Sequence, residues 1–149
     1  MRDGPSLRLV LGSAAALSVL FGVLAYKRYA QSEAYISESR KVLEEKGASL
    51  DAEGCIDAVI DWHEGCEAND TNQAVCTHAV KIEMFHCLKG RDRSETCEDY
   101  SEMPDKGKWV YKACEDRDMR CLNKRECPCA EAYRALESFC RTDQKAVQM

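Results

Sequence analysis

Apolar positions recur at helical spacing through most of the chain, and this pattern predicts an all-α fold. The pattern is clearest on the two sides of a polar break at residues 68–72. The residues that share one helix face are Cys55, Val59, Trp62 and Cys66 before the break, and Cys76, Val80, Met84 and Cys87 after it. The two helices are therefore predicted to fold back on each other as an antiparallel hairpin, with these faces as the seam.

The four cysteines of this hairpin have a symmetrical spacing. Cys55 and Cys66 are eleven residues apart, and the same distance separates Cys76 from Cys87. Eleven residues make about three helical turns, so each pair falls on one helix face. In an antiparallel hairpin Cys66 meets Cys76 beside the turn, and the same register brings Cys55 to Cys87 at the open end. We predict these two disulfides.

The N-terminal part of the chain contains an uncharged run of eighteen residues, 9–26. Eighteen residues are close to the lower limit for a membrane span, and Tyr26 with Lys27 and Arg28 is typical of its boundary. We predict a single N-terminal transmembrane helix, with a cleaved signal peptide and a buried soluble helix as the alternatives. The small residues that could pack against a neighbouring membrane helix are Ala14, Ser18 and Gly22.

The chain continues from this run without glycine or proline as far as Gly47, which predicts a mostly solvated helical stalk. Its thin apolar stripe consists of Tyr29, Tyr35, Ile36, Val42 and Leu43. Ser49 is the predicted N-cap of the next helix, at 50–67.

Residues after Gly90 are predicted to form three further helices. Their expected ranges are 95–103, 105–123 and from Pro128 onward. Antiparallel packing of the last two helices predicts the disulfides Cys114–Cys140 and Cys121–Cys129, and it leaves Cys97 to pair with Cys127. An exchange of partners between Cys127 and Cys129 needs little movement, so that alternative stays open.

Cysteine content and charge narrow the class of protein. All ten cysteines lie between Cys55 and Cys140, and a chain of 149 residues has a limited core, so disulfides are the expected supplement. Residues 47–149 carry 14 Lys and Arg against 21 Asp and Glu, and the whole chain has a net charge of −5. This acidic balance argues against nucleic acid or anionic lipid headgroups as the main partner of the domain.

The paired C-x10-C segments resemble the twin C-x9-C, or coiled-coil-helix-coiled-coil-helix (CHCH), proteins of the mitochondrial intermembrane space. The resemblance covers about residues 50–90 and departs from the family in having ten residues between the cysteines of each helix. It implies oxidative folding in the intermembrane space and a structural or assembly role. The expected organisation is a transmembrane anchor at 1–27, a helical stalk at 28–47, a CHCH-like hairpin at 48–91 and a Cys-rich helical extension at 92–149.

Two signals disagree about the side of the membrane on which the domain lies. Lys and Arg are denser after the predicted span, which favours the reducing side, where ten cysteines would not stay paired. The cysteine spacing is the more specific signal, so we expect the domain in the intermembrane space. The sequon Asn69-Asp70-Thr71 leaves a secretory type II membrane protein as an alternative, which a glycan on Asn69 would support.

Catalytic and metal-binding patterns are weak in this sequence. Cys127-Pro128-Cys129 resembles the redox element of an intermembrane-space oxidoreductase, but here it follows the hairpin and Lys124-Arg125-Glu126 precede it, so a structural role is favoured. Nitrogen and sulfur ligands could come from His63, Cys66, His78, His86 and Cys87, or from Cys121, Cys127 and Cys129. No twin C-x2-C pair with zinc spacing is present, and we predict no metal and no cofactor.

The resulting hypothesis is a non-enzymatic accessory subunit of a mitochondrial inner-membrane respiratory-chain complex or of the ATP synthase. Its partners would be the other subunits and inner-membrane lipid, not nucleic acid. The alternatives are a thiol-disulfide oxidoreductase or an assembly factor that uses Cys127-Pro128-Cys129. The acids of the first hairpin helix are Asp51, Glu53, Asp57, Asp61, Glu64 and Glu67. A solvated helix face is the favoured interpretation of these acids, and docking of a basic partner such as cytochrome c is the alternative.

Overall fold

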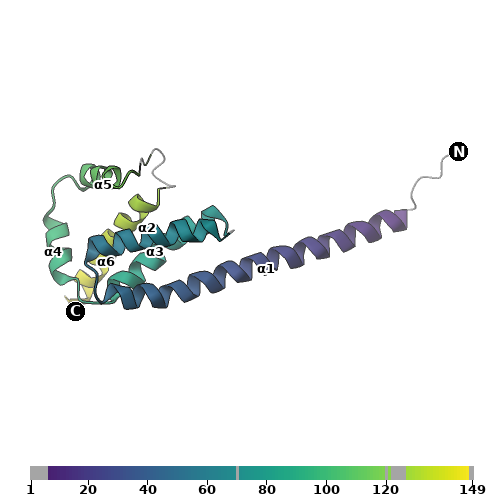
Figure 1. Ribbon diagram of the computed structural model, residues 1–149, viewed down its shortest axis with the longest axis horizontal. Coiled ribbons are helices and arrows are strands. Elements are labelled where there is room, and N and C mark those ends of the chain that lie inside the picture. Colours follow the sequence, from purple (N-terminus) through teal and green to yellow (C-terminus); the bar gives the residue numbers. More distant parts are fainter. Residues whose placement is uncertain (1–6, 70, 120, 122–126, 148–149) are drawn as a thin grey trace. The chain divides into compact units, whose positions relative to one another are not determined.

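The computed structural model describes residues 7–69, 71–119, 121 and 127–147, and side chains are described between residues 11 and 142. The described residues form helices and turns without a strand, which confirms the all-α prediction (Figure 1). The helices are α1 (Leu7–Gly47), α2 (Ala52–Ala68), α3 (Gln73–Lys89), α4 (Ser94–Glu102), α5 (Lys106–Glu115) and α6 (Pro128–Val147). The chain divides into two compact units, Met1–Ala34 and Tyr35–Met149, and α1 contributes to both.

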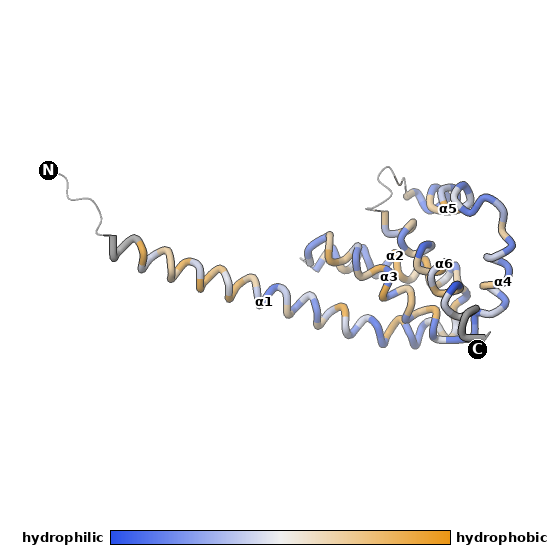
Figure 2. Tube along the Cα trace, turned by 180° about the vertical axis from the view of Figure 1, so that it is seen from behind, coloured by the Kyte–Doolittle hydropathy of each residue, from blue (hydrophilic) through white to orange (hydrophobic). Residues whose placement is uncertain are grey.

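The first unit contains no membrane span among its described residues. No helix in the described part of the chain is long and apolar enough to cross a membrane, so the predicted transmembrane anchor at 1–27 is wrong. The uncharged run at 9–26 contains glycine, serine and alanine as well as strongly apolar residues, which lowers its mean hydropathy. Paler positions interrupt the apolar ones along it (Figure 2). The expected packing of Ala14, Ser18 and Gly22 against membrane helices depended on this anchor, so it is withdrawn with it.

The second unit is built on the predicted α2–α3 hairpin. Asp51 caps α2, because its carboxylate accepts a hydrogen bond from the Gly54 backbone N–H at 2.7 Å. The predicted cap, Ser49, instead donates to the Lys46 carbonyl at 3.0 Å. Asn72 caps α3 by accepting from the backbone N–H two residues later. Each helix therefore has its own N-cap, and the cap of α3, Asn72, lies within the polar break that separates the two helices.

The hairpin is closed by sulfur at both ends. The structure joins Cys55 to Cys87 and Cys66 to Cys76, the same pairs that the antiparallel register predicts. Their Cα–Cα distances of 5.8 and 5.9 Å are ordinary for disulfides. The apolar residues that are fully buried in this part of the hairpin are Ile56, Val59, Val80 and Met84.

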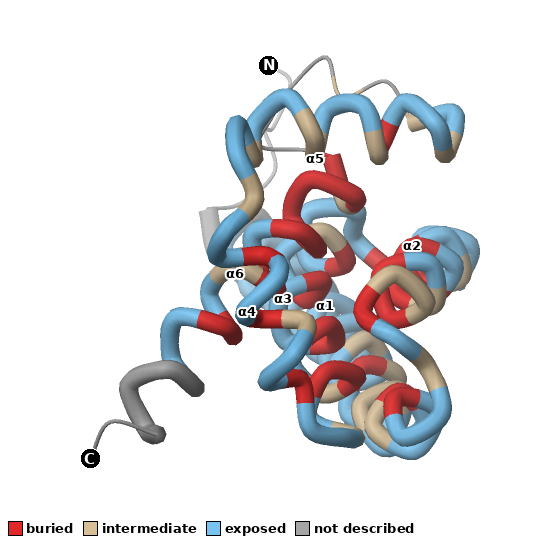
Figure 3. The backbone as a smooth tube through the Cα atoms, turned by 90° about the vertical axis from the view of Figure 1, so that its left-hand side faces the viewer, coloured by how far each residue is buried: buried red, intermediate tan, exposed pale blue. Residues whose placement is uncertain are grey.

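Helix α6 supplies most of the remaining core. It makes its most extensive contacts with α3 and further contacts with α2, α4 and α5. The buried apolar residues that it contributes include Ala132, Tyr133, Leu136, Phe139 and Cys140. Figure 3 shows the buried positions of α6, α3 and α2 gathered at the centre of this unit. The core is therefore a hairpin covered by a third helix from far along the sequence.

The C-terminal part of α1 belongs to this second unit. Ile36 and Leu43 of the predicted solvated stalk are buried in its core. Gly47 ends α1 so close to α3 that a Cβ placed on it would lie 1.9 Å from the Cys87 carbonyl oxygen. A Cβ on Gly90 would lie 2.5 Å from the Glu44 carbonyl oxygen. Glycine at both positions lets the ends of the two helices touch backbone to backbone.

Candidate functional site

The candidate site lies where α5 ends and α6 begins. Helix α5 stops at Glu115, and Asp118 in the following turn has a left-handed φ of 57°. The Met119 backbone N–H donates to the Cys114 carbonyl at 2.9 Å, which closes the turn. The predicted helix at 105–123 is therefore too long, and Cys121 lies beyond the end of α5 rather than on the same face as Cys114.

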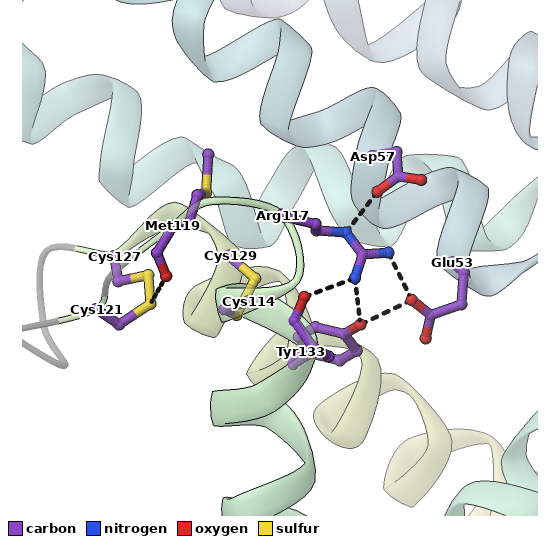
Figure 4. Close-up of a disulfide and its surroundings, with 10 residues drawn as sticks. Glu53, Asp57, Cys114, Arg117, Met119, Cys121, Cys127, Cys129 and Tyr133 are labelled. Atoms are coloured by element: carbon purple, nitrogen blue, oxygen red, sulfur yellow. Dashed lines mark hydrogen bonds and ion pairs between the residues drawn. A yellow bond between two sulfur atoms is a disulfide. The ribbon is translucent and has the colours of Figure 1, made fainter.

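Four cysteines meet at this turn. Cys114 bonds to Cys129 and Cys121 bonds to Cys127 (Figure 4). The sulfur atoms of Cys114, Cys121 and Cys127 all lie within 4.8 Å of one another. Cys121 is partly exposed and the other three are buried. We call these four residues the sulfur cluster.

The predicted pairs Cys114–Cys140, Cys121–Cys129 and Cys97–Cys127 are wrong. They assume that α5 and α6 form a second antiparallel hairpin. In the structure α6 packs along α3, and its C-terminal part contacts α4, so Cys140 bonds to Cys97 with a Cα–Cα distance of 5.1 Å. The early end of α5 then allows Cys121 to reach Cys127.

The Cys127-Pro128-Cys129 motif is not a redox disulfide in this structure. Its two cysteines bond to different partners, Cys121 and Cys114, and none of the ten cysteines is free. Cys129 has no exposed surface. An attacking thiolate could therefore reach only the Cys121–Cys127 bond without a local opening.

A polar network adjoins the sulfur cluster and joins it to α2. The Arg117 guanidinium donates to Glu53 Oε2 at 2.7 Å, to Asp57 Oδ1 at 2.6 Å and to the Ala113 carbonyl at 2.9 Å. The Tyr133 hydroxyl donates to Glu53 Oε2 at 2.7 Å (Figure 4). Two of the acids predicted to form a solvated face of α2 are therefore occupied within the protein.

The electrostatics of this network follow from its hydrogen bonds. Burial lowers the pKa of Arg117, but its hydrogen bonds to Asp57 and Glu53 outweigh that effect and hold the pKa above its ordinary value. Burial raises the pKa of Tyr133, and its hydrogen bond to the Glu53 carboxylate raises it further. Arg117 therefore stays a cation and Tyr133 stays a neutral donor throughout the ordinary pH range.

Arg93 is a structural residue that the sequence does not distinguish from its neighbour Arg91. It is 2% exposed, and its guanidinium donates to the carbonyls of Leu88 at 3.2 Å, Leu50 at 2.8 Å and Gly47 at 2.9 Å. Two of these carbonyls are at the C-terminal ends of α3 and α1, where a cation is favourable. Burial lowers the pKa of Arg93.

Glu83 is the second buried ionisable residue that sequence reasoning missed. It is fully buried on α3, and its nearest cation is Arg40, with 3.7 Å between Nε and Oε1. Burial raises the pKa of Glu83 to about 7, and the Ser39 hydroxyl and the Arg40 guanidinium offset only part of this. Glu83 lies next to the seam residue Met84 along α3, and the helical spacing of α3 contains no signal that α1 covers that side.

The predicted metal ligands of the hairpin do not come together. Each of the two buried or partly buried histidines has a partner in the protein: His63 Nε2 lies 3.2 Å from Thr77 Oγ1, and His86 Nδ1 lies 3.0 Å from Glu44 Oε2. Cys66 belongs to a disulfide at one end of the hairpin. Among the described residues, the one group of potential ligands within reach of a single ion is Cys114, Cys121 and Cys127. The second predicted ligand set, Cys121, Cys127 and Cys129, shares two residues with this group, in which Cys114 stands in place of Cys129.

Comparisons of this chain with known protein families, with curated proteins and with solved structures find no match. The structure defines the class: this is a small, disulfide-stabilised, all-helical protein. No family or homologue supports the resemblance to CHCH proteins, which rests on the spacing of four cysteines.

Proposed function

We propose that this protein is a non-enzymatic structural component of a mitochondrial intermembrane-space assembly, as an accessory subunit of a respiratory-chain complex or of the ATP synthase. The observation that carries the proposal is that all ten cysteines are paired, with a hairpin clamped at both ends. Such pairing persists in an oxidising compartment and rigidifies a surface rather than supplying a reactive group.

The exposed acids of α2 are the surface that we assign to a basic partner. Asp61, Glu64 and Glu67 are exposed, whereas Glu53 and Asp57 are engaged by Arg117. Cytochrome c has the charge that this surface would attract.

The compartment is tested by protease protection in mitochondria whose outer membrane has been selectively ruptured. Under the proposal, a tagged full-length chain becomes accessible only after rupture, and untreated protein shows no thiol that can be alkylated. A mass shift that glycosidase removes, and that Asn69→Gln abolishes, would instead assign the protein to the secretory pathway. Cys55 and Cys66 as free thiols would contradict the oxidised structure itself.

The subunit role is tested by purification in mild detergent followed by identification of the proteins that co-migrate. Stable co-migration with one respiratory complex or with the ATP synthase supports the proposal, and recovery only as a monomer opposes it. The triple variant Asp61→Asn, Glu64→Gln, Glu67→Gln should weaken the binding of a basic partner without unfolding the chain. The matched control is Glu95→Gln and Glu98→Gln on the exposed face of α4.

The oxidoreductase alternative predicts that purified protein oxidises the thiols of a reduced twin-cysteine peptide. The alternative depends on Cys129, which is buried and bonded to Cys114. Cys129→Ser would then abolish oxidation of the peptide. Under the structural proposal the unsubstituted protein already lacks this activity, and Cys129→Ser impairs folding or incorporation only.

A further inference from the structure

We propose that the sulfur cluster is a zinc site when its two disulfides are reduced, with Cys114, Cys121, Cys127 and Cys129 as the four thiolate ligands. The inference goes beyond the structural role proposed above and does not depend on the compartment. The disulfides Cys114–Cys129 and Cys121–Cys127 span 15 and 6 residues of sequence. The turn after α5 brings their sulfur atoms together, and the inference rests on that proximity.

The distances between sulfur atoms suit a single ion. Four sulfurs bound at about 2.3 Å to a tetrahedral zinc ion lie about 3.8 Å from one another. Three cluster sulfurs already lie within 4.8 Å of one another, and the fourth, on Cys129, is bonded to Cys114 Sγ. Reduction releases each bonded pair from its covalent distance. Shifts of about one to two ångström then bring the sulfurs of Cys114, Cys121 and Cys127 to tetrahedral separation, and Cys129 completes the set from its position next to Cys114.

The start of α6 favours thiolates at two of the four cysteines, Cys127 and Cys129. Cys129 lies in the first turn of α6, and Cys127 precedes that helix, with its carbonyl accepting from the Glu131 N–H at 3.0 Å. The N-terminal end of a helix stabilises a nearby negative charge and lowers the pKa of a thiol. Cys114 sits in the last turn of α5, and the partly exposed Cys121 gives an ion a route from solvent.

The frame of the cluster does not depend on its own disulfides alone. Arg117 and Tyr133 connect the end of α5 and the first turns of α6 to Glu53 on α2 through charge-assisted hydrogen bonds. Trp109 of α5 also packs edge-on against Tyr133, with 4.9 Å between ring centroids. These contacts hold the four ligands near one another after reduction.

The redox step is balanced with a dithiol as the reductant. Each disulfide accepts two electrons and two protons from one dithiol, which becomes a disulfide itself, so two dithiols yield the four free thiols. Binding of Zn²⁺ then forms four Zn–S bonds and displaces the four thiol protons to solvent. The disulfide form and the zinc form exclude each other, because each sulfur is either bonded to sulfur or bound to the metal.

The test uses the full-length chain reduced with a water-soluble phosphine, which becomes the phosphine oxide with oxygen from water. Co²⁺ serves as the spectroscopic probe, Zn²⁺ displaces it, and native mass spectrometry counts bound metal. We expect one tightly bound ion per chain, tetrahedral thiolate–cobalt absorption, and no binding by the oxidised protein. X-ray absorption of the zinc form should show four sulfur ligands at about 2.3 Å.

Other reduced cysteines could also bind metal, so paired variants assign the site. Cys121→Ser with Cys127→Ser removes two proposed ligands and should weaken binding by at least about 100-fold. Cys66→Ser with Cys76→Ser removes two cysteines at the far end of the hairpin and should leave the affinity within about threefold. Equal affinities in the two variants, or no binding by the reduced wild-type chain, would overturn the proposal.

A milder substitution separates loss of a ligand from loss of the fold. Cys121 lies outside the helices and is partly exposed, so changes there should leave the circular dichroism of the helices unchanged. Cys121→His keeps a zinc ligand and should retain the bound ion with a shifted cobalt spectrum. Cys121→Ala should lower the affinity by about tenfold or more. Binding that is indifferent to both changes contradicts the assignment of Cys121.

Discussion

The α2–α3 hairpin and the region from α4 to α6 are both crosslinked by disulfides, but different forces place their cysteines. In the hairpin, the two cysteines of each helix lie about three helical turns apart on one face, and the bonds close the two ends of a continuous apolar seam. In the α4–α6 region, the cysteines lie on short helices and turns. Their partners are decided by the packing of α6 on α3, which places Cys129 and Cys140 next to Cys114 and Cys97. Local periodicity therefore determines pairing only where both partners lie on adjacent antiparallel helices.

The two regions also treat buried charge differently. In the α4–α6 region, Arg117 is satisfied by two carboxylates of α2 and by a backbone carbonyl. On the hairpin side, Glu83 and Arg40 face each other at 3.7 Å, and within the described residues neither Glu83 oxygen nor Arg40 Nε has a hydrogen-bond partner. Short hydrogen bonds make the charge of Arg117 stabilising. The Glu83–Arg40 pair loses its hydration without gaining such bonds, which is destabilising.

The largest expected effect is at Arg93, where the hairpin meets α1. Arg93→Ala leaves three carbonyl acceptors without their donor in a buried site, and it should lower the free energy of unfolding by about 5 kcal/mol. Urea unfolding of the oxidised protein measures this change. The control is Arg91→Ala, because Arg91 is exposed and should matter by less than about 0.5 kcal/mol. Equal effects of the two substitutions would show that the three contacts contribute nothing.

The next effect compares one disulfide from each region. Cys97→Ser with Cys140→Ser opens a link across 43 residues and should cost about 4 kcal/mol, whereas Cys66→Ser with Cys76→Ser opens one across 10 residues and should cost about 3 kcal/mol. Thermal and urea unfolding of both variants check the order. A larger loss from the hairpin variant would mean that the seam depends on its crosslink more than loop entropy requires.

Glu83 should make the hairpin side sensitive to pH. Because its pKa rises from 4.5 in the unfolded chain to about 7 in the folded protein, the unfolded chain ionises first as the pH rises. Its contribution to stability is therefore fully present below about pH 4.5 and falls by about 3 kcal/mol by pH 7. Unfolding measured from pH 4 to 8 should show this slope in the wild-type chain and not in Glu83→Gln. Glu38→Gln, at an exposed position of α1, should keep it.

The smallest effect concerns the hydrogen bond between α6 and α2. Tyr133→Phe removes the donor to Glu53 while keeping the ring and its contact with Trp109, and it should cost about 1 kcal/mol. Tyr111→Phe, at an exposed position of α5, should be neutral. A double-mutant cycle with Glu53→Gln tests the coupling, and additive effects would mean that the two groups do not stabilise each other.

Much of the helical content could be predicted, because capping residues and apolar spacing act within a few positions along the chain. The break at residues 68–72, the start of α6 at Pro128 and the end of α1 at Gly47 agree with the structure. The end of α5 could not be predicted in the same way. Residues 116–119 carry no glycine or proline, and the left-handed turn at Asp118 is stabilised by the contacts of Arg117 with α2.

In the candidate site, too, part could be predicted from the sequence and part depended on the fold. The sequence contains Cys121, Cys127 and Cys129 as a possible ligand set, but nothing in their spacing brings in Cys114 or separates them into two disulfides. Arg93 and Glu83 are indistinguishable by pattern from exposed residues of the same type. Their burial depends on α1 packing over the open end and the side of the hairpin.

The sequence by itself determined the helical periods, the hairpin and its two disulfides, because these are set by residues within about thirty positions that share one helix face. The tertiary structure alone decided the three remaining pairs and the meeting of four sulfurs at one turn. It did so because α6 gains more by covering the hairpin seam than by pairing with the short α5, and a cysteine bonds to whichever sulfur that packing brings within reach.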